Sequence, residues 1–314
     1  MTMTRQHIVI TEFMDEAAVD SLRASFDVRY DPALVDGGDQ LLKAVAEADA
    51  VIVRNRTQMR GPLLTACRRA RVIGRLGVGL DNIDVAACDT RGITVIPATG
   101  ANAQAVAEYV IATAMLLLRG VFLSSRAVAA GQWPRAVLSH GRETAGTCLG
   151  LVGFGGIGQL TARMAHALGM TVVACDPLLP HDHAVWARTG VAPLSLEALL
   201  AVADVVSLHV PLTDATAGLL SAERLAQMKP DAVLINTSRG GIVDEAAVAD
   251  ALRQGRLGGA AFDVFAAEPL ADGSPWQHCP NTVLTPHVAG VTAESNVRVS
   301  TLIAAAVARA LAPS

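Results

Sequence analysis

Three segments in the second half of the chain follow apolar runs and carry polar side chains that a buried core would exclude. They are 236–241 (N-T-S-R-G-G), 262–269 (F-D-V-F-A-A-E-P) and 285–290 (T-P-H-V-A-G). The carboxyl ends of parallel strands line the ligand crevice of an open α/β sheet, so we expect Arg239, Glu268 and His287 to converge there. Together these side chains supply what the reduction of a carbonyl group needs.

Each of the three has a distinct chemical role. Arg239 can bind a substrate carboxylate through two parallel hydrogen bonds and polarise the neighbouring carbonyl. His287 can donate a proton to the developing alkoxide and remove it in the reverse direction. Glu268 can hydrogen-bond the imidazole, orient it and stabilise its protonated form. Singly, Arg239 could cap a helix and Glu268 could be a turn residue, so the prediction depends on the combination.

A nucleotide signature precedes these segments. Gly153, Gly155 and Gly158 form G-x-G-x-x-G directly after an apolar run and before a helical one, and Asp176 ends the next apolar run. The glycines permit a tight turn, close approach of a pyrophosphate and close packing of helix on strand. A carboxylate at the position of Asp176 can accept hydrogen bonds from the ribose hydroxyls and repel a 2′-phosphate. The alternative is an ordinary turn and loop acid, but strand, helix and acid together favour NAD as the cofactor.

Short apolar runs alternate with helical segments along most of the chain, and several runs are continuously apolar, as in strands buried on both faces of a parallel sheet. The repeated βα order predicts an α/β fold with two doubly wound domains. Strands are expected at 7–10, 50–53, 71–75, 94–96, 148–152, 171–175, 205–209, 232–236, 259–262 and 282–284, and helices at 102–119, 156–168, 245–254 and 292–311.

The domain boundaries are predicted from two helices. The apolar helix at 102–119 follows a break in the βα pattern, and the Ala-rich helix at 292–311 comes after the second set of βα units is complete. We therefore expect one domain at 101–285. The other is expected to be discontinuous, formed by 1–100 and 286–314.

The composition excludes several classes of protein. The 314 residues are 52% hydrophobic and 17% charged, which excludes disorder, collagen and coiled coil. Glycines and prolines interrupt the longest uncharged stretches, and no signal peptide is apparent, so no membrane association is expected. The net charge of −4, without a basic stripe, indicates no nucleic-acid partner. The five cysteines are scattered along the sequence, which favours a cytoplasmic protein with reduced thiols. His181 and His183 could bind a metal ion only with a third ligand, and the sequence shows none, so no metal is expected.

Over essentially its full length the chain resembles the D-isomer-specific 2-hydroxyacid dehydrogenase family, through segments 150–158, 203–213, 234–245, 263–269 and 285–290. The resemblance implies a Rossmann-type NAD-binding domain (101–285), a flavodoxin-like substrate domain, a cleft between them and a homodimer built around the helix at 102–119. It implies Arg239, Glu268 and His287 as catalytic residues, and it disfavours formate as the substrate because formate dehydrogenases of this fold carry Gln in place of Glu268. The implied cofactor-binding residues are Gly153, Gly155, Gly156, Ile157, Gly158, Asp176, His209, Pro211, Thr237, Ser238, Arg239, Asp263, His287 and Gly290.

The resemblance also bears on the substrate. Arg54 and Arg75, at two strand ends, resemble positions that bind a distal phosphate, and Arg56 would share the face of Arg54 if its strand continued. The loop Gly77–Gly79 is implied to present backbone N–H groups to the substrate carboxylate. The alternative is a solvated basic rim. The expected substrate-binding residues are Arg54, Arg56, Arg75, Gly77, Val78, Gly79 and Arg239.

Several substrates and one other class of protein stay open. Segments 12–15 and 53–58 look more like bacterial (S)-sulfolactate dehydrogenases, and 288–296 departs from many phosphoglycerate dehydrogenases. An anion-tailed acid such as (S)-3-sulfolactate, which has the spatial handedness of D-lactate, is therefore expected. D-3-phosphoglycerate and glyoxylate or hydroxypyruvate are alternatives. NAD-binding transcriptional corepressors also resemble the second half of the chain, although they usually carry additional disordered tails.

Overall fold

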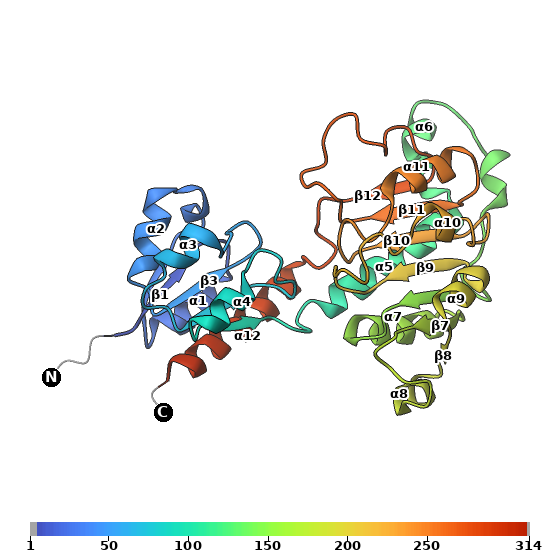
Figure 1. Ribbon diagram of the computed structural model, residues 1–314. Helices are drawn as coiled ribbons and strands as arrows, with labels where there is room; N and C mark the ends of the chain where they lie inside the picture. Colours follow the sequence, from blue (N-terminus) through green and yellow to red (C-terminus); the bar gives the residue numbers. More distant parts are fainter. Residues whose placement is uncertain (1–4, 313–314) are drawn as a thin grey trace. The chain divides into compact units, whose positions relative to one another are not determined.

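The computed structural model describes residues 5–312, which divide into two compact units (Figure 1). Unit 1 comprises Met1–Asn102 and Val291–Ser314, and unit 2 comprises Ala103–Gly290. The boundaries fall after Asn102 and after Gly290, where the sequence led us to expect them after residues 100 and 285. Each unit is built around its own parallel sheet.

Unit 1 contains a five-stranded parallel sheet in the order β2-β1-β3-β4-β5, which is the flavodoxin-like order. The strand order reverses between β1 and β3, so loops after these two strands lie at the position where doubly wound sheets bind ligands. The strands are β1 (His7–Ile10), β2 (Asp27–Tyr30), β3 (Ala50–Val53), β4 (Val72–Arg75) and β5 (Thr94–Pro97).

Helices cover both faces of this sheet because successive strand residues point to opposite sides. Ile8 and Ile10 pack in one cluster with residues of α1 (Glu16–Arg23) and α12 (Ala293–Leu311), while Val9 packs in another. The C-terminal helix α12, drawn in red in Figure 1, begins with a capping box formed by Thr292 and Ser295. On the other face lie α2 (Asp39–Ala46), α3 (Gly61–Ala66) and α4 (Val85–Thr90), and a short 3-10 helix, η1, spans Leu34–Asp36.

Unit 2 contains a seven-stranded parallel sheet in the order β12-β11-β10-β9-β6-β7-β8. Renumbered within the unit, this is the Rossmann order 3-2-1-4-5-6 with one further strand, and the order reverses between β6 and β9. The strands are β6 (Cys148–Val152), β7 (Thr171–Cys175), β8 (Ala192–Pro193), β9 (Val205–Leu208), β10 (Val233–Asn236), β11 (Gly259–Phe262) and β12 (Thr282–Leu284).

Two buried clusters lie on opposite faces of the second sheet. One includes residues of α5 (Ala103–Arg119), α7 (Gly156–Ala167) and α8 (Ala184–Thr189), and the other includes residues of α9 (Leu196–Val202), α10 (Ala222–Leu225) and α11 (Glu245–Arg253). Both sheets are therefore covered on both faces. The remaining elements of unit 2 are η2 (Phe122–Ser124), α6 (Ser125–Ala129) and η3 (Val137–His140).

The predicted fold class is confirmed, as are the ten strands expected from the sequence, each within one residue of its observed bounds. Two strands were missed. β2 alternates half-buried and exposed residues at a sheet edge, and its four residues are too few for the alternation to stand out. β8 consists of only Ala192 and Pro193. Among the described residues no single helix is long and apolar enough to cross a membrane; α5 reaches that composition only with the bent segment that follows it.

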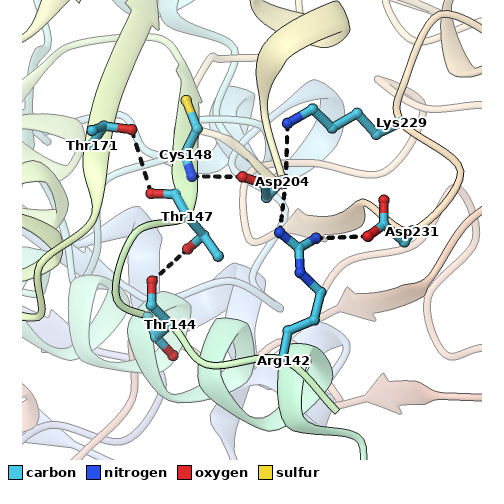
Figure 2. A network of polar contacts seen from close by, with 8 residues as sticks. All are labelled: Arg142, Thr144, Thr147, Cys148, Thr171, Asp204, Lys229 and Asp231. Atoms are coloured by element: carbon cyan, nitrogen blue, oxygen red, sulfur yellow. Dashed lines mark hydrogen bonds and ion pairs between the residues drawn. The ribbon is translucent and has the colours of Figure 1, made fainter. Parts of the chain in front are cut away.

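A buried carboxylate lies at the amino end of each sheet. Asp204 precedes β9 and accepts hydrogen bonds from the N–H of Cys148 (2.8 Å), from Arg142 (2.9 Å) and from Lys229 (3.0 Å), as Figure 2 shows. In unit 1, Asp49 precedes β3 and accepts from the N–H of His7 at 2.8 Å. Each sheet thus has a buried, hydrogen-bonded carboxylate at the end opposite its carboxyl edge.

Candidate active site

The three polar segments singled out in the sequence follow adjacent strands of unit 2. In the sheet register Asn236, at the end of β10, pairs with Phe262 of β11, and Phe262 pairs with Leu284 of β12. The strands are parallel, so the segments that carry Arg239, Glu268 and His287 leave the same edge of the sheet.

Asp263 binds the loop that carries His287 to the end of β11. Its carboxylate is buried and accepts hydrogen bonds from the Thr285 hydroxyl (2.6 Å) and from the backbone N–H groups of Val288 and Ala289 (both 2.8 Å). The backbone N–H of His287 also donates to the carbonyl of Asp263 at 2.8 Å. The position of the His287 backbone is therefore fixed by the strand beside it.

Glu268 and His287 form a hydrogen-bonded pair. Oε2 of Glu268 lies 2.8 Å from Nδ1 of His287, and Oε1 accepts the backbone N–H of Phe265 at 3.0 Å. With its two oxygens held in this way, Glu268 can accept a hydrogen bond from Nδ1 when that nitrogen carries a proton. Among the residues that the structure describes, Nε2 of His287 makes no hydrogen bond, and the His287 side chain is 41% exposed. Nε2 is thus the ring atom available to a substrate.

The segment that carries Arg239 packs directly against the segment that carries Glu268. A Cβ atom on Gly240 would lie 1.9 Å from the carbonyl oxygen of Phe265, so only glycine allows this approach. The amide of Asn236 donates to the carbonyl of Arg239 at 3.0 Å, and Nη1 of Arg239 donates to the carbonyl of Ser238 at 2.5 Å. The structure thus places the three predicted catalytic residues on neighbouring, mutually packed loops.

Tyr109 supports this site and was missed in the sequence. Its hydroxyl lies 2.7 Å from Oγ1 of Thr285, which donates to Asp263, so α5 is linked to the loop of His287. Burial raises the pKa of Tyr109, the hydrogen bond with Thr285 opposes this shift and the Asp263 charge adds to it. The available signal was that a polar aromatic residue, one of two tyrosines, occurs within an otherwise apolar helix.

The loop between β6 and α7 has the features of a dinucleotide site. Gly153 has a positive φ of 95°, and a Cβ there would lie 2.5 Å from the His209 carbonyl oxygen. Gly155 and Gly156 have neither constraint, since no heavy atom lies within 4 Å of a Cβ placed on them. The chain itself does not explain why these two positions are glycine. Open space at the amino end of α7 fits a pyrophosphate, which would accept its N–H groups.

Two other groups fit the same ligand. Asp176 follows β7, and its carboxylate accepts the N–H of Phe154, in the glycine loop, at 2.8 Å and that of Leu178 at 3.0 Å. The buried Oγ1 of Thr237 makes no hydrogen bond within the described part of the chain. The residues present therefore fit a dinucleotide. Of the other predicted cofactor residues, Ile157 and Gly158 lie in the first turn of α7, Pro211 and Gly290 lie in loops, and Ser238 donates to the Leu208 carbonyl at 2.6 Å.

His209 directly follows β9 and is neutral in the folded protein. Nε2 of its ring lies 3.0 Å from Oγ of Ser207, and burial lowers the pKa of His209 to about 4. An unfolded histidine has a pKa of about 6.5. The unfolded chain consequently binds the proton first as the pH falls.

This difference predicts a stability change with pH. As the pH falls from about 7 to about 5, the unfolded state gains a proton at His209 that the folded state does not, so the free energy of unfolding falls by roughly 1–2 kcal/mol from this residue. Denaturant unfolding of the wild type and of His209→Gln at the two pH values measures it. A smaller loss in the variant is expected, and equal losses would contradict the assignment.

In unit 1 the predicted substrate arginines occupy different surroundings. Arg54 follows β3, and its guanidinium donates to Oδ1 of Asn296 at 2.9 Å. β3 ends at Val53, so the strand does not continue to Arg56, and the same-face arrangement that depended on its continuing does not form. Arg56 is instead paired with Asp36 at 2.5 Å.

The loop after β4 contains backbone donors that have no acceptor among the described residues. The guanidinium of Arg75 lies against Gly77, where a Cβ would be 1.4 Å from Nη1. The N–H of Gly77 donates to the Arg75 carbonyl at 2.8 Å, whereas those of Val78 and Gly79 make no hydrogen bond among the described residues. Two adjacent unsatisfied N–H groups beside an arginine can bind a carboxylate.

No group of three or more His, Cys, Asp or Glu side chains suited to a metal ion occurs in residues 5–312.

Comparison with known proteins places this site in a family. The profile of the D-isomer specific 2-hydroxyacid dehydrogenase NAD binding domain matches residues 111–289. The (S)-sulfolactate dehydrogenase of Chromohalobacter salexigens is 51% identical over 304 residues, covering 97% of this chain and 98% of that protein. The D-3-phosphoglycerate dehydrogenase of Mycobacterium tuberculosis is 40% identical over 97% of this chain, which spans 57% of that protein's length.

The fold comparison agrees. The crystal structure of the TT0316 protein from Thermus thermophilus superposes with a TM-score of 0.86 at 35% identity, covering 95% of this chain and 94% of that one. The chain therefore belongs to the D-isomer-specific 2-hydroxyacid dehydrogenase family and is an NAD-dependent oxidoreductase that interconverts a 2-hydroxy acid and its 2-oxo acid.

Proposed function

We propose that the substrate is (S)-3-sulfolactate, which the enzyme interconverts with sulfopyruvate. The observation that carries this proposal is the 51% identity, over nearly the full length of both chains, with a protein named for that activity. Two features of unit 1 support it. Arg54 follows β3 and Arg75 ends the adjacent strand β4. The N–H groups of Val78 and Gly79, in the loop after β4, make no hydrogen bond among the described residues.

The catalytic roles follow from the contacts within unit 2. His287 transfers the proton at Nε2, because Nδ1 is engaged by Glu268. Glu268 orients the ring, because its own position is held by the N–H of Phe265. Its negative charge stabilises the imidazolium. Arg239 binds the carboxylate of the substrate and polarises the carbonyl that becomes the alcohol.

NAD supplies the hydride acceptor in oxidation and the hydride donor in reduction. Gly155 and Gly156 would hold its pyrophosphate at the start of α7, Asp176 its adenosine ribose, and Thr237 would give a hydroxyl to the dinucleotide. Asp263 keeps the His287 loop in place and has one acceptor position left, which suits a carboxamide N–H.

D-3-phosphoglycerate is the second candidate, because a 40% identical relative is a D-3-phosphoglycerate dehydrogenase. Both acids carry a carboxylate, a 2-hydroxyl and an anionic tail. They differ in whether the tail is a sulfonate or a phosphate.

NADH oxidation with a panel of 2-oxo acids tests the proposal. Sulfopyruvate, phosphohydroxypyruvate, glyoxylate, hydroxypyruvate and a bulky apolar acid are compared by kcat/KM. Sulfopyruvate is expected to be highest, by about tenfold or more over the acids without an anionic tail, since a charge-assisted hydrogen bond contributes roughly 1.5–3 kcal/mol. A higher value for glyoxylate would refute the proposed substrate, and no oxidation of any acid would favour a partner-binding function.

The choice of NAD over NADP is tested at Asp176. Replacement by alanine removes the carboxylate that repels a 2′-phosphate, so the ratio of kcat/KM for NAD to that for NADP is expected to fall by roughly tenfold or more. Asp182→Ala, a change of the same kind in the loop that follows, is the control. An unchanged ratio in Asp176→Ala would contradict the assignment.

We also propose a cytoplasmic homodimer, with unit 1 as the substrate domain and unit 2 as the NAD-binding domain. The dimer proposal is supported by apolar side chains exposed after α5, which a second copy could cover. These are Phe122 (60% exposed), Leu123 (47%), Trp133 (78%) and Val137 (77%).

A further inference from the structure

A buried carboxylate binds the backbone of the proposed tail-binding arginine. Glu12 follows β1 and is 5% exposed. Its Oε1 accepts the N–H groups of Arg54 (2.9 Å) and Thr57 (3.0 Å), and its Oε2 accepts the N–H of Arg56 (3.1 Å). Since both oxygens act as acceptors, Glu12 shapes the loop after β3 as a carboxylate and places a negative charge at its base.

The guanidinium of Arg54 is fixed in place and partly removed from water. It donates to Asn296 at 2.9 Å and lies over the ring of Phe13, 5.7 Å from the ring centroid. Burial lowers the pKa of Arg54, and the charge of Glu12 opposes that shift. A cation with little hydration favours an anionic ligand, but Glu12 already compensates part of its charge.

The positive charge of the neighbouring Arg56 is also compensated by a carboxylate. Arg56 is paired with Asp36 at 2.5 Å, and both side chains are more than half exposed. After β3, Arg54 and Arg56 thus stand with two carboxylates, Glu12 and Asp36. Because Glu12 already compensates part of the charge of Arg54, each further negative charge on a bound tail is opposed.

Sulfonate and phosphate tails differ in the negative charge that they carry. A sulfonate carries one negative charge, whereas a phosphate monoester carries about 1.5 to 2 at pH 7, with a second pKa near 6. We propose that Glu12 is a specificity-determining residue, whose charge near Arg54 makes the site accept a monoanionic sulfonate tail and reject a dianionic phosphate. This inference rests on the proposed function, in which Arg54 binds the tail of the substrate.

Glu12→Gln tests the proposal, with Asp49→Asn as the matched control. Glutamine retains an acceptor for two of the three N–H groups but removes the charge. Asp49 is likewise a buried carboxylate that accepts a strand N–H (His7, 2.8 Å), but it lies at the opposite end of the sheet. The measurements are kcat/KM for sulfopyruvate and phosphohydroxypyruvate, and Kd for sulfolactate and 3-phosphoglycerate in the presence of NAD.

The wild type is expected to favour the sulfonate by about tenfold, and Glu12→Gln to reduce that ratio by about tenfold, mainly through a lower KM for the phosphate. Asp49→Asn is expected to leave the ratio unchanged. A wild-type ratio that favours phosphate, or an equal ratio in the wild type and Glu12→Gln, would overturn the inference. If Glu12 had only a structural role, its replacement would lower kcat/KM for both substrates by the same factor.

The unaltered enzyme gives a second test that does not depend on folding of a variant. Lowering the pH from about 8 to about 5.5 converts the phosphate tail largely to a monoanion and leaves the sulfonate unchanged. Among the described contacts, the charged groups at this loop are Glu12, Arg56 and Asp36, with Arg75 at the end of the neighbouring strand β4, and none of these is a histidine. The ratio of kcat/KM for sulfopyruvate to that for phosphohydroxypyruvate is expected to fall several-fold, and an unchanged ratio would contradict the inference.

Failure of the proposed function has a different signature. If neither acid is turned over, the assignment of the substrate is wrong. The ratio of the two Kd values in the wild type and Glu12→Gln still decides whether Glu12 discriminates by charge.

Discussion

Replacement of His287 by asparagine is expected to lower kcat by about 10²–10⁴-fold while the affinity for NADH stays within a few-fold of the wild type. The variant loses Nε2 of His287, which we propose transfers the proton, because the other ring nitrogen, Nδ1, is hydrogen-bonded to Glu268. The glycine loop and Asp176, which we propose hold the dinucleotide, are unchanged. Steady-state kinetics and NADH fluorescence titration measure the two quantities.

The backbone at this position guides the choice of substitution. His287 has a positive φ of 57°, a conformation that asparagine adopts more readily than most residues. His278 has a φ of 60° and lies in the same unit, so His278→Asn is a matched control for the backbone effect. Normal turnover in His287→Asn, or an equal loss in His278→Asn, would remove His287 from the mechanism.

The largest expected change in stability is at Asp204. Asp204→Asn leaves Arg142 and Lys229 without the buried carboxylate that they share (Figure 2), and we expect the free energy of unfolding to fall by about 2–3 kcal/mol. The value is at the low end for buried pairs because Arg142 and Lys229 are 33% and 37% exposed. Denaturant unfolding near pH 7 measures it.

The control is Asp231→Asn, which removes the other partner of Arg142. Asp231 is 63% exposed, so the expected loss is about 0.5 kcal/mol or less. Burial raises the pKa of Asp204, but the hydrogen bonds from Cys148, Arg142 and Lys229 outweigh it and the pKa is lowered. The stabilisation is therefore complete above the unfolded value near 3.9 and is lost only as the pH falls through the lower folded value. Equal losses in the two variants would contradict the account.

Much of the fold was predictable because local pattern and burial agree. Strands β6, β9 and β10 are almost entirely apolar, with Ser207 and Asn236 as polar exceptions, and they are buried on both faces. Their sequence pattern therefore reflects their place at the centre of a sheet. The edge strands β2 and β8 were missed because half-exposed residues have no such constraint. The helix at the C-terminus was predicted from its Ala-rich run after the second set of βα units, and in the structure Thr292 and Ser295 form its capping box.

The site was predictable in part for a similar reason. Arg239, Glu268 and His287 are polar residues that follow buried strands, so they stand out in the sequence. Tyr109 did not, because its role depends on the contact with Thr285, 176 positions away in the chain.

Glu12 was equally hard to assign from the sequence, in which it is one of 29 acidic residues. Its hydrogen bonds to the loop after β3 are made 42 to 45 positions away. Such long-range contacts leave no periodic signal in the sequence.

The most direct test of the assigned reaction is the product that the enzyme forms from sulfopyruvate and NADH. We expect stoichiometric oxidation of NADH and a single product, (S)-3-sulfolactate, identified by chiral chromatography. Formation of the (R) enantiomer, or no oxidation of NADH, would contradict the account.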